Sequence, residues 1–422
     1  MKIKELTNEE FMSFSEYFPV SSLYQTSEYA MTMTKQKFDS FYLGMYDDSN
    51  NLVAASLIMV ELLGKFQYAY APRGFLIDYN NENYVKTFTK LVKKYLRKKS
   101  IIAVKISPLI IKSTYTKKDG LIPNENFDNT FKLLKKLKYY HLGYNNFFEA
   151  IKPRYEAIID LDKDIAQMFS KISKNYRTKI RTSDRLGIRI YKGDERYLPL
   201  LYKLTAKKYP RDLEYLKALY NYYKNRNMVD LYFALLDTRR YLINVQKEYQ
   251  RQNIKCTKVT DDIFKNQGKA SSTLIARKIS EDNKLAAIKR QLIQATHLLQ
   301  QNPDGIVVAS AIMVKHHSEV YLVLDGYDVN YKSVNAKHLL IWKLMEKYAQ
   351  EGYNKFNLGG MSNPLLTEKN KYIGLNEFKL GFGAKAVEYI GDLELVTSPI
   401  LYALYRNGSP FRKMKNKKKT KD

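Results

Sequence analysis

An apolar six-residue pattern, Ala-Ser-Leu/Ala-Ile-Met-Val, occurs at residues 55–60 and again at residues 309–314. Both copies have the composition of a buried strand. Residues 41–46, upstream of the first copy, also have strand composition, and the turn residues 47–51 would close a hairpin between the two strands. The matching strand before the second copy is residues 231–236. The repeat predicts a duplicated α/β module, and it constrains the fold more than any other feature of the chain.

An insertion distinguishes the second copy from the first. Where the first hairpin has a short turn, the second has the charged stretch 237–302. Residues spaced by three and four predict two amphipathic helices here, joined by a turn at residues 266–269. Their polar outer faces favour an antiparallel coiled-coil arm, residues 238–302, that projects from the second module. The two stripes are Leu242, Val245, Tyr249, Gln252, Cys256, Val259 and Ile263, and Leu285, Ile288, Leu292, Ala295 and Leu299.

Length and charge limit the class of protein. The chain has 422 residues, 45% of them hydrophobic, which is enough for two or three packed domains. Its formal net charge of +28 attracts polyanions such as RNA, anionic lipid surfaces and phosphorylated substrates. A general lysine bias is the alternative explanation. Basic residues also cluster, at residues 171–189 and 413–421, which favours a functional role for the charge.

The location of the protein follows from what the sequence lacks. A single cysteine excludes internal disulfides, and the N-terminal residues have no apolar segment typical of a secretory signal. The apolar runs at residues 52–60 and 306–314 are too short to span a bilayer as helices. We therefore expect a cytoplasmic protein, with at most peripheral contact at the inner face of the plasma membrane.

Common catalytic motifs are also absent. The sequence has neither a Gly-x-x-x-x-Gly-Lys-Ser/Thr loop nor a Gly-x-Gly-x-x-Gly segment after a strand, so we expect no ATP hydrolysis and no nicotinamide cofactor. No Gly-x-Ser-x-Gly segment is present, and the five histidines lack metal-ligand spacing. We expect no metal and no cofactor, and an enzyme of this sequence would need a donor that arrives already activated.

Four segments carry a resemblance to a known family. They are Tyr-Ala-Pro-Arg-Gly-Phe-Leu-Ile-Asp at 70–78, Lys-Ile-Ser-Pro at 105–108, Asn-Leu-Gly-Gly at 357–360, and 374–391, which begins Gly-Leu-Asn-Glu-Phe-Lys-Leu-Gly-Phe-Gly. In composition and order they resemble the Fem family of peptidoglycan-bridge aminoacyltransferases, over nearly the whole chain. The resemblance implies an α/β (α+β) fold of two tandem GNAT-like acyltransferase modules, with the arm inserted in the second.

The resemblance and the repeat together predict the domain organisation. Residues 1–150 form the first module and residues 151–386 the second, which the arm interrupts. Residues 387–411 return to the first module. Residues 412–422 form a basic, disordered tail that could hold the protein near anionic lipid.

The resemblance implies a reaction. Family members transfer an amino acid, usually Gly, Ala or Ser, from aminoacyl-tRNA to an amine of the peptidoglycan precursor stem, carried on lipid II or on UDP-MurNAc-pentapeptide. An aminoacyl ester is already activated, which agrees with the missing ATP motifs. The arm resembles the tRNA-binding coiled coil of seryl-tRNA synthetase, with Arg251, Lys255 and Lys258 as candidate contacts. A scaffold or dimerisation role for the arm is the alternative.

Candidate catalytic residues lie in the fourth segment. Attack of an amine on an ester produces a tetrahedral oxyanion, which a fixed cation stabilises. The resemblance places Lys379 in this role, with Phe378 shaping the pocket. No carboxylate is identified as the general base, although Asp325 could orient a substrate group. The glycines around Lys379 permit close backbone approach to a ligand.

Candidate substrate-binding residues are more scattered. The resemblance indicates Lys35 and the pair Arg211 and Tyr215 for the precursor, where Lys and Arg suit phosphate. Arg73, in the first of the four segments, is a further substrate-binding candidate.

The sequence departs from the family pattern at three places. Phe75 and Ser107 replace the more usual Pro and Asp, and an arginine expected before residues 336–348 is missing, with Lys337 nearby. These departures concern the substrate details.

Two other functions stay open at this point. One is an acyl-CoA-dependent N-acyltransferase. Such enzymes usually have a glycine-rich loop that binds the CoA pyrophosphate, and this sequence has no good match to it; the nearest is residues 371–376. The other is a non-catalytic RNA-binding protein that uses the basic arm and some of the 36 tyrosines. The glycine-rich segment 374–391 favours the transferase, because an RNA-binding protein has no need of it.

Overall fold

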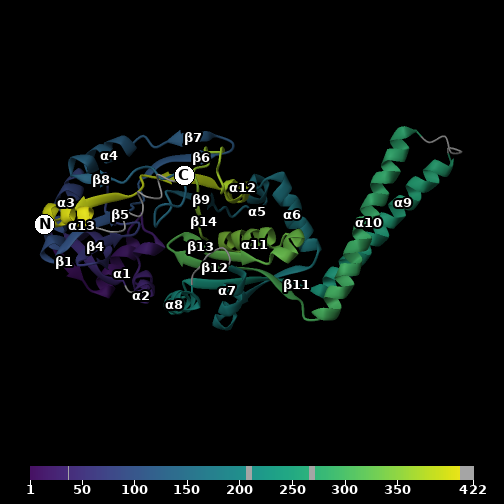
Figure 1. Cartoon of the computed structure of the whole chain (residues 1–422), viewed down its shortest axis with the longest axis horizontal. Helices are drawn as coiled ribbons and strands as arrows, with labels where there is room; N and C mark the ends of the chain where they lie inside the picture. Colours follow the sequence, from purple (N-terminus) through teal and green to yellow (C-terminus); the bar gives the residue numbers. More distant parts are fainter. Residues whose placement is uncertain (37, 206–211, 266–270, 409–422) are drawn as a thin grey trace.

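The computed structural model describes residues 1–422 except 37, 206–211, 266–270 and 409–422. Two mixed β-sheets with helices on their faces form the body, and two long helices extend from one end of it (Figure 1). The expected α/β class is confirmed. Among the described residues, no helix combines the length and the apolar character that crossing a membrane requires.

The first sheet has the strand order β1-β2-β3-β4-β5-β16-β8. Its amphipathic helices bury one face each; in α3 the buried residues recur at spacings of three and four, as a helix on a sheet requires. The strands are β1 (Lys2–Leu6), β2 (Asp39–Tyr46), β3 (Leu52–Leu63), β4 (Phe66–Ala71), β5 (Ile101–Ile106), β8 (Tyr139–His141) and β16 (Leu393–Val396); the helices are α1 (Asn8–Tyr17), η1 (Leu23–Gln25), α2 (Ser27–Thr34), α3 (Glu82–Lys98), α4 (Phe127–Lys136) and α13 (Pro399–Gly408).

The second sheet has the order β10-β11-β12-β13-β14-β9-β15-β6-β7. Its strands are β6 (Ile111–Thr116), β7 (Gly120–Pro123), β9 (Tyr155–Asp160), β10 (Ile188–Gly193), β11 (Val229–Leu236), β12 (Ile306–His316), β13 (Glu319–Tyr327), β14 (Lys355–Met361) and β15 (Lys385–Tyr389). The helices of this half are α5 (Ile165–Lys171), α6 (Lys174–Arg185), η2 (Glu195–Tyr197), α7 (Leu198–Thr205), α8 (Leu213–Lys224), η3 (Val329–Val334), α11 (Ala336–Gln350) and α12 (Ile373–Gly381).

The two sheets share one strand pattern. In the first, β1 to β4 pair antiparallel in sequence and β4 then pairs parallel with β5. In the second, β10 to β13 pair antiparallel and β13 pairs parallel with β14. The repeated hexapeptide occupies the third strand of each series, β3 and β12. The sequence repeat therefore coincides with a repeat of topology.

The sheets do not divide the chain at one point. Strands β6 and β7 precede residue 150 but extend the second sheet, whereas β16 lies between β5 and β8 of the first. The division into modules at residues 1–150, 151–386 and 387–411 therefore stays a prediction. One apolar core is shared by both halves, because α2 packs against α8 and residues such as Leu57 and Phe233 belong to the same buried cluster.

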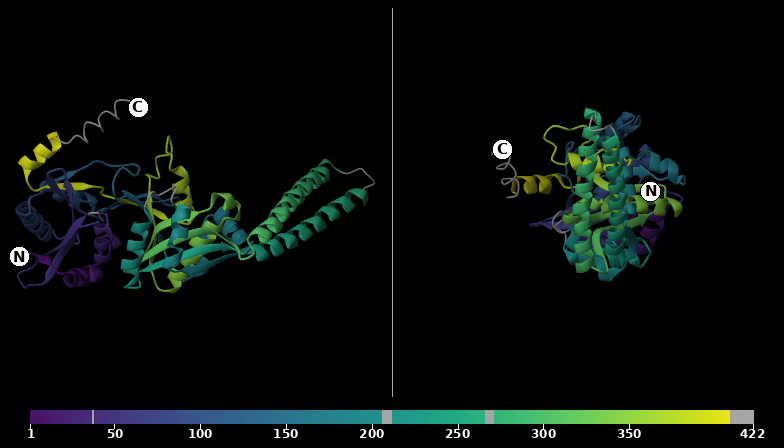
Figure 2. Two further views of the ribbon diagram at one scale, coloured as in Figure 1. Left: turned by 60° about the horizontal axis from the view of Figure 1, so that its bottom comes forward. Right: turned by 90° about the vertical axis from the view of Figure 1, so that its right-hand side faces the viewer.

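The two inserted helices, α9 (Thr238–Lys265) and α10 (Ser272–Gln301), lie side by side and project from the body (Figures 1 and 2). The predicted stripes face inward: Val245, Cys256, Val259 and Ala295 are buried. Gln252 Nε2 donates to Glu281 Oε2 of the neighbouring helix at 2.6 Å. Coiled-coil packing stays a prediction, and the turn expected at 266–269 lies outside the described residues.

A buried ion pair joins the two sheets. Arg73 follows β4 of the first sheet, and its Nη2 donates to Glu156 Oε1 on β9 of the second at 2.5 Å and to the Pro153 carbonyl at 2.8 Å. Both side chains are almost fully buried, with 2% and 7% exposed. Asn357 Nδ2 donates to the second oxygen, Glu156 Oε2, at 3.0 Å.

We predict that Glu156→Ala lowers the free energy of unfolding by about 3–5 kcal/mol, because the Arg73 guanidinium would stay buried without its counter-ion. Urea unfolding followed by circular dichroism measures this loss. Asp160→Ala on the same strand is the control: Asp160 is 61% exposed and pairs with Lys385, so its removal should cost under about 1 kcal/mol. Equal losses in both variants would contradict a special role for the buried pair.

Candidate active site

A cavity of about 1110 Å³ opens where β13 and β14 separate. These parallel neighbours pair only over residues 319–321 with 355–357. Beyond that register no ladder joins them, and the following residues, 322–325 and 358–360, line the cavity. The carboxyl ends of parallel strands that part in this way leave room for a ligand between backbones. The cavity is therefore the first candidate for an active site.

Several elements complete its wall. Tyr176 and Lys179 come from α6, Lys337 and His338 from the start of α11, and Phe378 and Lys379 from α12. Tyr24 comes from the first half of the chain, in η1. The cavity thus lies mainly in the second half but includes a side chain from the first.

Lys379 is the central charged group of this cavity. It lies in the last turn of α12, is 7% exposed, and its Nζ donates to the Gly360 carbonyl of β14 at 2.5 Å. Burial lowers the pKa of Lys379 to about 7; Asp325 opposes this shift and Lys337 adds to it. Near neutral pH the amine therefore exists in both its charged and its neutral form.

Two glycines allow this arrangement. Gly359 has φ +77°, a left-handed conformation that favours glycine, and its N–H donates to Asn357 Oδ1 at 2.8 Å. This bend in β14 turns the Gly360 carbonyl toward Lys379. At the end of α12, a Cβ on Gly381 would collide with the ring of Tyr176. Because residue 381 is a glycine, the Tyr176 ring of α6 can pack directly against α12.

An ion pair and an aromatic cluster lie beside Lys379. Lys337 Nζ pairs with Asp325 Oδ2, and both side chains are 16% exposed. The same Nζ lies 4.2 Å from the centroid of the Phe378 ring. Phe378 also contacts the rings of Tyr176 and His338, with centroids 6.1 and 5.4 Å away. Phe378 therefore forms part of an aromatic wall that carries a fixed cation.

No motif in the sequence indicated His338 as a site residue. Its two ring nitrogens have no hydrogen-bond partner among the described residues, although it lines the cavity. Burial lowers its pKa to about 4, with Lys179 and Lys337 adding to the shift. A neutral imidazole here can donate to or accept from a substrate group. Its position next to Lys337 was the only signal in the sequence.

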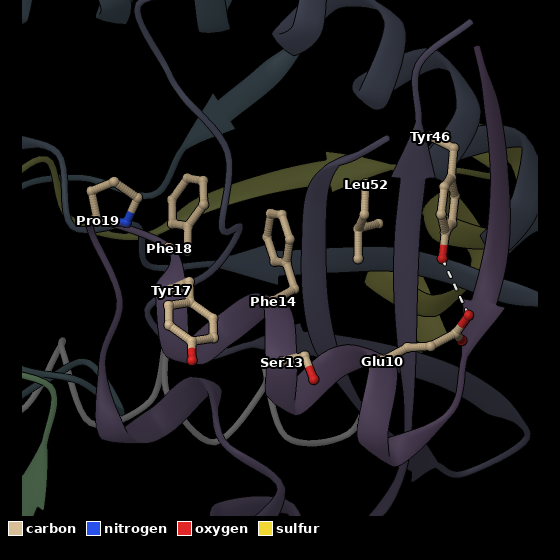
Figure 3. A pocket seen from close by; sticks show the side chains of 8 residues that line it. All are labelled: Glu10, Ser13, Phe14, Tyr17, Phe18, Pro19, Tyr46 and Leu52. Atoms are coloured by element: carbon tan, nitrogen blue, oxygen red, sulfur yellow. Dashed lines mark hydrogen bonds between the residues drawn. The ribbon is translucent and has the colours of Figure 1, made fainter. Parts of the chain in front are cut away.

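A second hollow lies on the outer side of α1 and has a different character. It measures about 400 Å³ and is lined largely by rings and Leu52 (Figure 3). Its carboxylate, Glu10, accepts from Tyr46 at 3.3 Å and from Lys4 at 2.8 Å. These contacts satisfy the acid, and no lysine or histidine lines the hollow. It offers little chemistry for group transfer.

Comparison with known proteins now identifies the family. The model of the FemAB family matches residues 6–407 of this chain. The chain belongs to the FemAB family. The resemblance inferred from the four sequence segments is thereby confirmed.

Curated relatives in the FemAB family cover nearly the full length. Aminoacyltransferase FemA of Staphylococcus epidermidis (strain ATCC 35984) is 23% identical over 426 residues, 98% of this chain and 100% of the relative. Aminoacyltransferase FemA of Staphylococcus aureus (strain bovine RF122) is 24% identical over 419 residues, 96% and 97% of the two chains. The crystal structure of FemX superposes with a TM-score of 0.74 at 20% identity, covering 96% of this chain and 99% of that chain, and so shares the fold.

Four residues were predicted to bind the substrate, and none of the three that the structure describes lines the cavity. Lys35, at the C-terminal end of α2, is exposed, and Tyr215 is buried in α8. Neither lines the cavity, although α2 and α8 pack together. Arg73 is buried against Glu156 rather than in the cavity wall, and Arg211 lies outside the described residues. Substrate binding by these four residues stays a prediction.

The depressed pKa of Lys379 leads to a testable pH dependence of stability. The folded pKa of about 7 lies below the unfolded value of 10.5, so the unfolded chain binds more protons between these values. Wild-type stability should therefore rise with pH in this window, by up to about 1.4 kcal/mol per pH unit relative to Lys379→Met. Unfolding free energies measured from pH 6 to pH 10 test this.

The matched control is Lys343→Met on α11, whose side chain is 45% exposed. Its stability should stay parallel to that of the wild type over the whole pH range. If the unfolding free energy of Lys379→Met also ran parallel to that of the wild type from pH 6 to pH 10, Lys379 would have an ordinary pKa in the folded protein.

Proposed function

We propose that this chain is an aminoacyltransferase that moves an amino acid from aminoacyl-tRNA to an amine of the peptidoglycan precursor stem, carried on lipid II or UDP-MurNAc-pentapeptide. Membership of the FemAB family, whose FemA relatives are named aminoacyltransferases, supports the reaction class. The observation that carries the proposal is Lys379, buried in the cavity where β13 and β14 part. The shared strand pattern of the two sheets supports two GNAT-like modules.

The proposed chemistry requires only groups that the cavity and the substrates supply. The acceptor amine attacks the ester carbonyl, forming a C–N bond and a tetrahedral oxyanion. The C–O bond to the tRNA ribose then breaks, and the ribose oxygen takes up the proton that the amine loses. The charged form of Lys379 donates to the oxyanion, a contribution of a few kcal/mol for a pre-positioned donor. Its contact with the Gly360 carbonyl fixes the ammonium before substrate arrives.

The neighbouring groups are suited to positioning the substrate. Lys337, held by Asp325, places a second positive charge in the cavity, suited to a carboxylate or phosphate of a substrate. The Phe378 ring lies against this charge, with its centroid 4.2 Å from Lys337 Nζ. His338 adds a neutral hydrogen-bonding group. No general base is assigned among these residues.

We predict that Lys379→Ala lowers the rate of transfer about 10²–10³-fold, the usual effect of removing one oxyanion donor. The assay uses tRNA charged separately with radiolabelled Gly, Ala or Ser, with lipid II or UDP-MurNAc-pentapeptide as acceptor. The control Lys343→Ala, an exposed lysine on α11, should retain the wild-type rate. Transfer from none of the charged tRNAs, with tRNA still bound, would instead support the RNA-binding alternative.

The projecting helices supply a candidate surface for the tRNA. Arg251, Lys255 and Lys258 are all exposed, and their spacing of four and three puts them on one face of α9, away from the buried stripe. A row of cations on a projecting helix can follow a phosphate backbone.

We predict that reversing all three charges, to Glu, weakens tRNA binding and makes it less dependent on salt. Each lost phosphate contact should lower the slope of log affinity against log salt by about 0.7–0.9. Filter binding over a range of salt concentrations measures this. The control is the same reversal at Lys132, Lys135 and Lys136, exposed residues of α4. An unchanged slope together with a changed oligomeric mass would support the dimerisation alternative.

A further inference from the structure

Helix α13, at the end of the described chain, turns an apolar face to solvent. Ile400, Leu401 and Leu404 are 78%, 39% and 55% exposed. Their spacing, one and then three residues apart, places them on one side of the helix. Exposed large apolar side chains that gather in this way mark a contact surface for something else.

The opposite side of α13 fixes how the helix lies. The hydroxyls of Tyr402 and of Tyr68 on β4 both donate to Glu394, a buried carboxylate on β16. The Tyr405 ring packs on Phe66, which is also on β4, with centroids 5.9 Å apart. Because these contacts hold the tyrosine side against the body, the apolar side must point outward. Figure 2 shows α13 standing out from the body at the end opposite α9 and α10.

Several basic residues lie near α13. Arg97, followed by Lys98 and Lys99 at the end of α3, donates through Nε to the Thr397 carbonyl at 2.7 Å, just before α13 begins. Lys65 lies above the Phe66 ring and Arg406 beside the Tyr402 ring.

The charge continues in the sequence after α13. Residues 412–422 contain seven lysines or arginines and one acid. A short apolar face bordered by cations is the composition of a helix that lies in a membrane interface.

We infer that α13 binds an anionic phospholipid surface. Ile400, Leu401 and Leu404 enter the boundary between headgroups and acyl chains, while the surrounding lysines and arginines contact lipid phosphates. A second copy of this chain fits the face less well, because two copies would bring their clusters of positive charge together. The inference does not depend on the proposed transfer reaction.

Co-sedimentation of the full-length protein with vesicles tests this inference. Phosphatidylglycerol–phosphatidylcholine vesicles supply the anionic surface, and pure phosphatidylcholine vesicles supply a neutral one. Ile400→Ser with Leu404→Ser should reduce binding to the anionic vesicles about 10- to 100-fold, because two apolar side chains no longer leave water. The wild-type protein should bind the neutral vesicles much less well than the anionic ones.

The matched control is the double variant Ile275→Ser with Ile279→Ser on α10. These two isoleucines are 48% and 57% exposed, and they lie four residues apart, as Ile400 and Leu404 do. This control should bind as the wild type does, and both variants should keep the wild-type melting temperature. Equal binding by all three proteins, or equal losses in both variants, would overturn the inference. Light scattering that revealed a dimer lost in the α13 variant would also overturn it, in favour of a second copy as the occupant.

Discussion

The short parallel pairing of β13 with β14 is the constraint on which the functional part of this structure depends. The two strands share a ladder over only three residues of each and then separate. The gap between them is filled neither by backbone nor by a further strand, so side chains from α6, α11 and α12 surround a cavity there. A longer ladder would close this space and leave Lys379 with no cavity to face.

A cost in stability accompanies that arrangement. Lys379 is a buried amine whose charged form loses hydration, and the Gly360 carbonyl and the nearby Asp325 only partly replace it. The protein keeps this group at a position where an apolar side chain would pack without such a penalty. Strained or destabilising groups are typical of functional sites, and the rest of the fold compensates through extensive apolar cores. The buried Arg73–Glu156 pair is a second polar feature of this kind, at the junction of the sheets.

The sequence predicted those parts of the site that a local pattern encodes. Lys379 and Phe378 share one glycine-rich segment of one short helix, so their neighbourhood is contained in the chain around them. His338 could not be found in this way, because it lies on α11, is distant in sequence from Lys379, and reaches the cavity only through the packing of helices against one another. Arg73 shows the opposite case. An arginine in a family segment suggested substrate binding, but its buried contact with β9 depends on a strand from the other sheet.

The sequence by itself determined the repeat, the mixed α/β class, the two long helices and the segment that carries Lys379, because each follows from spacing or motif within a short stretch of chain. Only the tertiary structure decided that β6 and β7 extend the second sheet and that β16 returns to the first. It also decided that Tyr215 is buried against α2 and that the apolar side of α13 faces solvent. The physical reason is that strand partners and helix neighbours are selected by burial summed over the whole chain, whereas periodicity reports only which side of an element is apolar.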